Sequence, residues 1–196
     1  MTGSSLSPGS RPDASPTPSR GLSGSEILAD PLVRELLEAR LVGVLATLEP
    51  DGSVHAVPLW YALDGDAIVL ATGSASRKVA NLRRDPRATL VLHDSRPGFE
   101  VCGVSIRGEV ELVEGAGARP LVDLVHGRYV TPSGERLPAP AEFLSSDDLA
   151  VRLIPAVAFT WDERRSAAAR DLAAAGAALA LEPTSPRAPG DTLATG

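Results

Sequence analysis

The sequence predicts a mostly β domain with short helices, in which six strands form a small closed or split barrel. Apolar, strand-like runs separated by tight turns follow one another from residue 41 onward. A single short helix interrupts them between the third and fourth strands. Aromatic residues make up only 4% of the chain, so we expect a core of Val, Leu, Ile and Ala side chains, as suits a small barrel.

The chain begins with a segment that cannot form a core. Residues 1–23 are rich in Ser, Pro and Gly without hydrophobic periodicity, which predicts a disordered tail. Residues 25–41 are predicted to be helical, with Asp30 as N-cap and Pro31 at the first helical position. Four leucines share one face of this helix: Leu32, Leu36, Leu37 and Leu41.

Turn residues divide the barrel into strands. Residues 49–52 and 64–66 are predicted turns, because each places glycine where a tight turn accepts it. The short helix covers residues 74–84 and ends before Pro86, since the residue before proline avoids helical angles. Pro155 predicts an edge or a bulge in the last strand. The six predicted strands are residues 41–48, 53–62, 67–72, 88–93, 100–113 and 151–161.

Two further helices complete the predicted organisation. Residues 117–130 place apolar side chains on one helical face. The barrel domain is therefore predicted to span residues 24–163, followed by an alanine-rich helix at 164–182 and a disordered tail at 183–196.

Composition excludes several classes of function. The net charge of −6 argues against a general binder of nucleic acid or of anionic membranes. The single cysteine, Cys102, excludes an internal disulfide and a cysteine-based zinc cluster. No apolar run reaches the length of a membrane span, and the first 24 residues lack the apolar core of a signal peptide, so we expect a cytoplasmic protein.

The strongest chemical signal follows the third strand. A serine, an arginine and the only lysine of the chain stand together as Ser76, Arg77 and Lys78 at the predicted start of the short helix, four residues after Thr72. Helix N-terminal amides and cationic side chains at one place make an anion site, best suited to a phosphate. A solvated basic helix face is the alternative, and a nucleic-acid patch is a weaker one, because more arginines follow at Arg83, Arg84 and Arg87.

A second candidate is the strand from His55 to Trp60. Pro58 must lie where its missing N–H is not needed, so the strand can present free backbone groups to a ligand beside the flat Trp60 ring. Ordinary barrel packing is the alternative. The three histidines lie on separate predicted elements without metal-ligand spacing: His55, His93 and His126.

Together these residues resemble the FMN-binding split-barrel superfamily, which contains pyridoxamine 5'-phosphate oxidases and flavin/deazaflavin oxidoreductases. The resemblance covers residues 36–161 and is most specific in Ala71-Thr72, Ser76-Arg77-Lys78 and the following Asn81-Leu82 and Asp85-Pro86-Arg87. It implies a six-stranded split barrel and a homodimer with the cofactor at the subunit interface. It also implies a phosphate-binding role for Thr72, Ser76, Arg77 and Lys78, main-chain contacts to the flavin ring from Val57, Pro58, Leu59 and Trp60, and further cofactor contacts from Ala71 and Trp161.

The departures from the family narrow the expected activity. The chain lacks the terminal Trp and Arg residues that grip pyridoxal phosphate, and Gly103 falls near the position of a flavin-binding glutamine. A vitamin B6 oxidase is therefore not expected. The chain looks most like the branch that uses the deazaflavin coenzyme F420, whose anionic tail could meet Arg83, Arg84 or Arg87.

The resemblance thus implies an oxidoreductase that transfers a hydride between coenzyme F420 or FMN and a small organic acceptor. Solvent, Tyr61 and an arginine-bound water remain open as the source of the proton. The alternative is a non-catalytic split barrel that carries or senses flavin or haem, with His55, His93 or His126 as the axial ligand of the haem.

Overall fold

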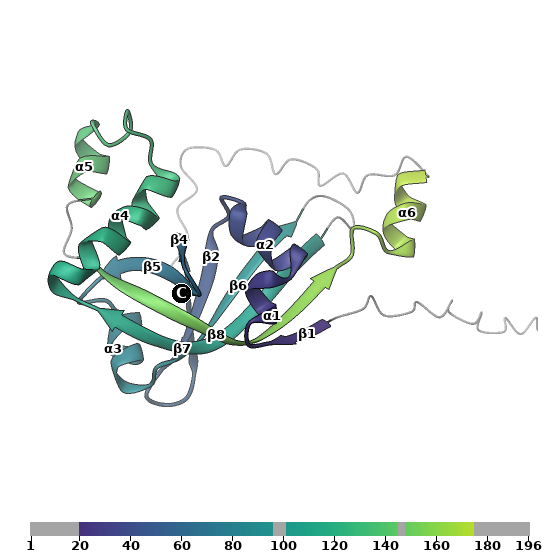
Figure 1. Ribbon diagram of the computed structural model, residues 1–196, viewed down its shortest axis with the longest axis horizontal. Coiled ribbons are helices and arrows are strands. Elements are labelled where there is room, and N and C mark those ends of the chain that lie inside the picture. Colours follow the sequence, from purple (N-terminus) through teal and green to yellow (C-terminus); the bar gives the residue numbers. More distant parts are fainter. Residues whose placement is uncertain (1–19, 96–100, 145–147, 175–196) are drawn as a thin grey trace, which may run out of the picture.

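The computed structural model describes residues 20–95, 101–144 and 148–174, which form one curled antiparallel sheet with helices at both ends (Figure 1). The strands are β1 (Arg20–Ser23), β2 (Gly43–Leu48), β3 (Val54–Leu59), β4 (Tyr61–Asp64), β5 (Ala67–Gly73), β6 (Arg87–Ser95), β7 (Val101–Val113) and β8 (Asp148–Asp162). The helices are α1 (Glu26–Ala29), α2 (Pro31–Glu38), α3 (Arg77–Arg84), α4 (Ala118–Tyr129), α5 (Pro138–Leu144) and α6 (Ala167–Ala174), with a 3-10 turn at Gly115–Gly117. The strand order is β3-β2-β6-β7-β8-β5-β4, and β1 pairs with β8. This is the split barrel that the sequence predicts.

The prediction of six strands was wrong in number, because the described residues form eight. Residues 53–62 form two strands: the chain breaks at Trp60, β3 pairs with β2, and β4 pairs with β5. The other addition is β1, at the end of the predicted tail, where buried Leu22 fixes the segment against β8. The rest of that tail, the last predicted tail and residues 175–182 lie outside the described residues.

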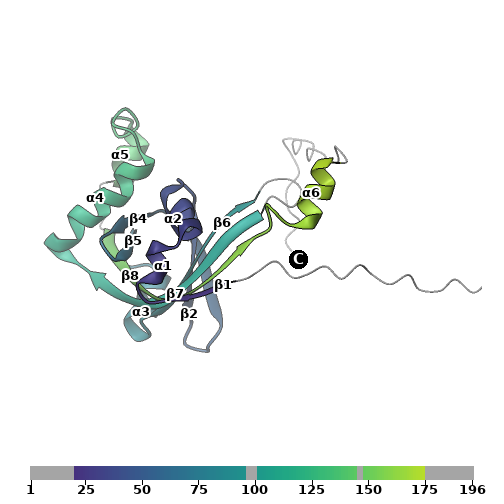
Figure 2. The ribbon, with the colours of Figure 1, turned by 45° about the vertical axis from the view of Figure 1, so that its right-hand side comes forward.

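The concave face of the sheet is covered by α1 and α2 (Figure 2). The predicted helix at residues 25–41 is divided at Asp30, whose extended backbone precedes Pro31. The Asp30 carboxylate accepts hydrogen bonds from the amides of Leu32 and Val33 at 3.0 and 3.2 Å, so its predicted N-cap role is confirmed. The core between helices and sheet includes Ile27, Leu36, Leu37, Leu45, Leu90 and Ile106.

Pro155 lies where β8 changes partners. Before it, residues 148–153 pair with β5; after it, residues 157–160 pair with β1. The register with β7 shifts between Arg107 and Gly108, opposite Pro155, which confirms the predicted bulge. A Cβ at Gly108 would stand 1.9 Å from the Ile154 carbonyl oxygen, so only glycine allows the strands to approach here.

The far end of β8 is held to α2 by one arginine. The Arg164 guanidinium lies 2.7 Å from a carboxylate oxygen of Asp162 and 2.5 Å from one of Glu35. Hydrogen bonds from Arg164 lower the pKa of both carboxyl groups. In the part of the chain that the structure describes, no helix is long and apolar enough to cross a membrane.

Candidate functional site

The turn between β5 and α3 brings together three of the four predicted phosphate-binding side chains. The Lys78 ammonium donates a hydrogen bond to the Thr72 hydroxyl at 2.9 Å, and the Thr72 and Ser76 hydroxyl oxygens are 3.5 Å apart. Ser76 is the N-cap residue of α3, and among the described residues its side chain caps no helix amide. We call Thr72, Ser76, Arg77 and Lys78 the cradle.

The cradle combines hydroxyls, cations and a helix N-terminus. Burial lowers the pKa of Lys78, and the Asp148 carboxylate opposes that shift. The Ser76 carbonyl already accepts the amides of Val79 and Ala80, while the first amides of a helix point out of its N-terminus. This donor set fits a phosphate group.

Arg77, the fourth residue of the cradle, faces a carboxylate. Its guanidinium stands 3.7 Å from Glu49, which is also 3.9 Å from a ring nitrogen of His55. The Arg77 side chain is 71% exposed, whereas that of Glu49 is 19% exposed. Glu49 therefore offsets part of the positive charge that Arg77 would offer to an anion.

A cavity of about 370 Å³ begins next to the cradle. Pro58, Leu59 and Trp60 line it from β3 and its end, and Ala71, the residue before Thr72, lines it from β5. Val57 lies on β3 opposite Leu45 of β2 but does not line the cavity. Pro58 sits on a terminal strand of the sheet order, where the missing N–H costs no inner ladder bond.

Trp60 offers less free ring surface than the sequence indicates. Its ring stacks on Tyr129 of α4, with centroids 5.0 Å apart and planes at 3°. The His126 ring meets it edge-on at 6.3 Å. One face of the indole is therefore covered by the chain itself.

His126 also lines this cavity, and the sequence argument considered it only as a candidate haem ligand. It lines the cavity together with Trp60, and its Nε2 atom is 3.6 Å from Asp148, with side chains only 6% and 8% exposed. Burial lowers the pKa of His126, while Asp148 opposes the shift. One sequence signal could have linked His126 to the site: it lies three residues before Tyr129, on the same helix face. Its contact with Asp148 of β8 depends on tertiary packing.

Tyr61 is part of the core and not of the cavity. Its side chain is fully buried, and its hydroxyl donates to the carbonyl oxygens of Leu36 and Ala39, which lie 2.8 and 2.9 Å away. Burial raises its pKa to about 12. Of the proton sources left open by the sequence, Tyr61 is therefore excluded.

Trp161 is not brought to the cradle of its own chain. It lies thirteen residues along β8 from Asp148, a path of about 40 Å at the usual strand rise. Its ring covers Gly103, where a Cβ would stand 2.1 Å from the indole. A cofactor contact from Trp161 remains a prediction that requires a second copy of the chain.

The three arginines considered for an anionic tail already have partners. Arg83 bonds to Glu114 at 2.6 Å, and Arg87 bonds to the Asp85 carboxylate at 2.6 and 2.9 Å. Arg84 donates to the Asn81 side chain and to the Leu48 carbonyl. A tail would have to displace these contacts.

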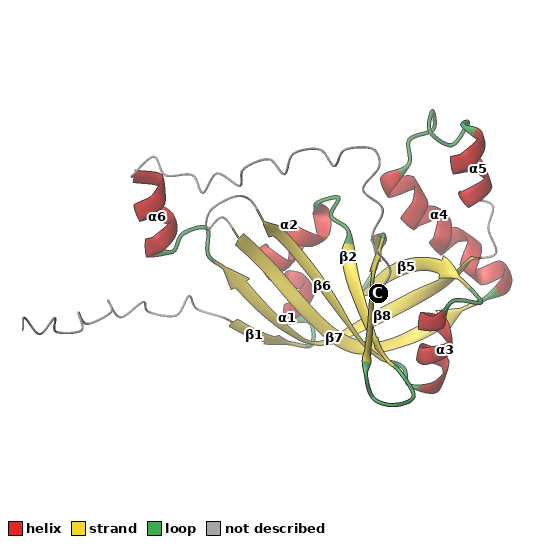
Figure 3. Ribbon diagram, turned by 180° about the vertical axis from the view of Figure 1, so that it is seen from behind, coloured by secondary structure: helices red, strands yellow, loops and turns green. Residues whose placement is uncertain are grey.

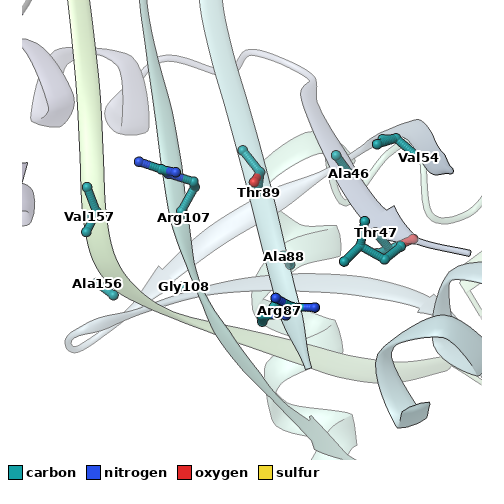
Figure 4. Close-up of a pocket in the computed structure, with 11 residues that line it drawn as sticks. Ala46, Thr47, Val54, Arg87, Ala88, Thr89, Arg107, Gly108, Ala156 and Val157 are labelled. Atoms are coloured by element: carbon teal, nitrogen blue, oxygen red, sulfur yellow. The ribbon is translucent and has the colours of Figure 1, made fainter. Parts of the chain in front are cut away.

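A second hollow of about 470 Å³ lies on the outer side of the sheet, and of the three arginines considered for an anionic tail Arg87 lines it (Figure 4). Val157 on β8 and Val54 on β3 lie at its two sides, with Arg107 and Thr89 between them. Within the described ranges no group of three or more His, Cys, Asp or Glu side chains could hold a metal ion.

The curled antiparallel sheet is that of a split barrel. The family model for pyridoxamine 5'-phosphate oxidase matches residues 29–162, and the chain belongs to this family. No curated protein sequence matches the chain.

Solved structures agree with this assignment. The conserved hypothetical protein Rv2991 from Mycobacterium tuberculosis is 29% identical, with 73% of this chain and 91% of that chain covered and a TM-score of 0.59. A protein named F420 reductase is 26% identical, with coverage of 63% and 94% and a TM-score of 0.50. The heme storage protein HutZ from Vibrio cholerae is 15% identical over 65% of this chain and 92% of that chain, with a TM-score of 0.52, and shares the fold alone.

Proposed function

We propose that the protein is an oxidoreductase that transfers a hydride between coenzyme F420 or FMN and a small organic acceptor. The observation that carries the proposal is the position of the cradle. Lys78, Thr72 and Ser76 gather at a helix N-terminus, one residue along β5 from a cavity whose wall is the predicted ring-binding strand. The likeness to a protein named F420 reductase supports the choice of cofactor class.

The residues of the chain would bind and orient the cofactor and shield the reacting atoms from water. The cradle would hold the phosphate through charge-assisted hydrogen bonds, and the end of β3 would lie along the ring, with Trp60 fixed by its stacking on Tyr129. When bound, either cofactor supplies two-electron hydride chemistry that no amino-acid side chain offers. The apolar cavity wall would exclude water from the reacting atoms.

Binding and turnover can be tested separately. Purified protein is titrated with FMN and with F420, and binding is followed by cofactor fluorescence. Lys78→Ala should weaken binding about 10- to 150-fold, since a charge-assisted hydrogen bond contributes about 1.5–3 kcal/mol. For FMN, which lacks the anionic tail of F420, Arg83→Ala is the matched control, because Arg83 lies on the same helix but pairs with Glu114; it should bind FMN like the wild type.

The outcomes separate an enzyme from a carrier. Reduction of a quinone or an enone by the loaded protein supports the oxidoreductase. Tight cofactor binding without reduction of either a quinone or an enone indicates a flavin carrier or sensor instead. Binding of neither cofactor at micromolar concentration overturns the proposal, and a haem spectrum in the purified protein indicates the haem-binding alternative.

We also propose that a second copy of this chain covers the outer hollow. Val54, Val157 and Phe159 are 65%, 40% and 48% exposed, and the last two lie two residues apart on one face of β8. Large exposed apolar side chains around a hollow are typical of an interface. Val157→Asp should convert a dimer into a monomer in sedimentation velocity; a monomeric wild type refutes this proposal.

A cytoplasmic location also stays a proposal from the sequence.

A further inference from the structure

We propose that His126, positioned by Asp148, is the residue that exchanges a proton with the acceptor bound beside Trp60. The inference rests on the proposed function and deepens it. It concerns Asp148, which the sequence argument does not name, and His126, which that argument names only as a candidate haem ligand.

The placement of His126 carries the argument. It stands on α4, which packs on β5 and β8 at the same end of the molecule as α3 (Figures 1 and 3). Its ring meets the Trp60 ring edge-on and contributes to the wall of the 370 Å³ cavity. An imidazole in this wall, beside Pro58, Leu59 and Ala71, places an acid–base group next to the predicted ring-binding strand.

His126 also lines a second cavity, of about 430 Å³, which is more polar. Arg119, Asp123 and Glu135 lie in its wall, together with residues of α5. The imidazole therefore stands between an inner, mostly apolar cavity and an outer polar one. A group in this position can take a proton from water on one side and deliver it on the other.

Asp148 gives the imidazole its orientation. Its carboxylate faces Nε2 at 3.6 Å, and both side chains are more than nine-tenths buried. Nδ1 is buried, so the exchange of the proton is assigned to Nε2, the ring nitrogen beside Asp148. Asp148 also acts on Lys78 of the cradle, so one carboxylate borders the anion site and the proton-exchanging site.

The proton balance is simple. The acceptor gains two electrons and one hydrogen nucleus as hydride from the reduced coenzyme. The N–H bond of the His126 imidazolium breaks, and an O–H or N–H bond forms on the acceptor. The neutral imidazole regains its proton from water, so the acceptor gains two hydrogens in total.

The charges around His126 determine when it is protonated. Asp148 on β8 favours the imidazolium, as does Asp123 on its own helix, whereas Arg119 and burial disfavour it. Glu135 faces the same outer cavity, and Lys78 offsets part of the charge of Asp148. Replacement of Asp148 by asparagine should therefore lower the pKa of His126.

The first test needs no turnover. The chain has three histidines, so NMR resolves three imidazole signals, and His126→Asn assigns one by its loss. We expect this signal to titrate at lower pH in Asp148→Asn and to move when FMN is added. The exposed His93 provides the control signal, which should not move.

The second test uses the acceptor that the wild type reduces. His126→Asn should lower kcat at least tenfold and leave the FMN dissociation constant within twofold, since general acid–base catalysis contributes about 10²–10⁴-fold. Asp148→Asn should move the basic limb of the pH–rate profile, on which the imidazolium loses its proton, to lower pH, a change that a purely structural role does not produce. His93→Asn should match the wild type.

The two failures are distinguishable. If the wild type binds a cofactor and reduces an acceptor, but His126→Asn has an unchanged kcat or Asp148→Asn an unchanged pH profile, this inference is overturned and the proposed function stands. If the wild type binds neither cofactor, the proposed function fails and removes the role of His126 with it.

Discussion

Removal of the carboxylate at Glu49 should strengthen phosphate binding at the cradle. Glu49 lies 3.7 Å from the Arg77 guanidinium and so competes with any anion for it. Two unit charges about 4 Å apart interact by about 1 kcal/mol in a water-like medium. The water-like value applies here because the Arg77 side chain is 71% exposed. Exposed ion pairs typically contribute about 0.2–1 kcal/mol. Glu49→Gln should therefore tighten FMN binding by a factor of about 1.5 to 5.

The assay is a fluorescence titration of FMN at low and at high salt. The gain in Glu49→Gln should shrink at high salt, because screening weakens exposed charges. Glu114→Gln is the matched control, since it removes a carboxylate that pairs with Arg83 at the other end of α3. Unchanged or weaker FMN binding in Glu49→Gln would refute the view that Glu49 opposes the anion.

Three further predictions concern stability and packing. Tyr61→Phe should cost about 1–3 kcal/mol, because the buried Leu36 carbonyl loses its Tyr61 donor, whereas the Ala39 carbonyl keeps a hydrogen bond from Arg128. The melting temperature should fall by several degrees; an unchanged melting curve contradicts the buried role. Gly103→Ala should displace the Trp161 ring, which should be visible as a red shift of indole emission. An emission spectrum identical to that of the wild type would contradict this contact. The Arg164 pairs add stability above the ordinary carboxyl pKa values of 4.5 and 3.8, and lose it as the pH falls through the lowered values. Arg164→Ala should therefore lower the melting temperature more at pH 7 than at pH 3; an equal loss at both refutes this.

Local chemistry made much of the fold predictable. Asp30 before Pro31 marks a helix start, and Pro155 in an apolar run marks a bulge, because each proline removes an N–H and restricts its neighbour. The break at Trp60 carries no such signal. Residues 53–62 read as one strand, and only the choice of different partners for β3 and β4 separates them.

The candidate site likewise contains some contacts that the sequence predicts and others that it does not. Thr72, Ser76 and Lys78 lie close in sequence, so spacing alone could predict that they meet. His126 and Asp148 come from a helix and a strand that meet only in the folded chain. The contact of Arg77 with Glu49 is likewise tertiary, and it reduces the positive charge that the sequence assigns to the cradle.

The most direct test of the cradle compares FMN with riboflavin, which carries the same ring system without the phosphate. Both are titrated into the wild-type protein by isothermal calorimetry under the same buffer and salt. If the cradle holds the phosphate, FMN should bind at least about tenfold more tightly, since even one charge-assisted hydrogen bond contributes about 1.5 kcal/mol. Equal affinity for FMN and riboflavin would contradict the phosphate site at Thr72, Ser76, Arg77 and Lys78.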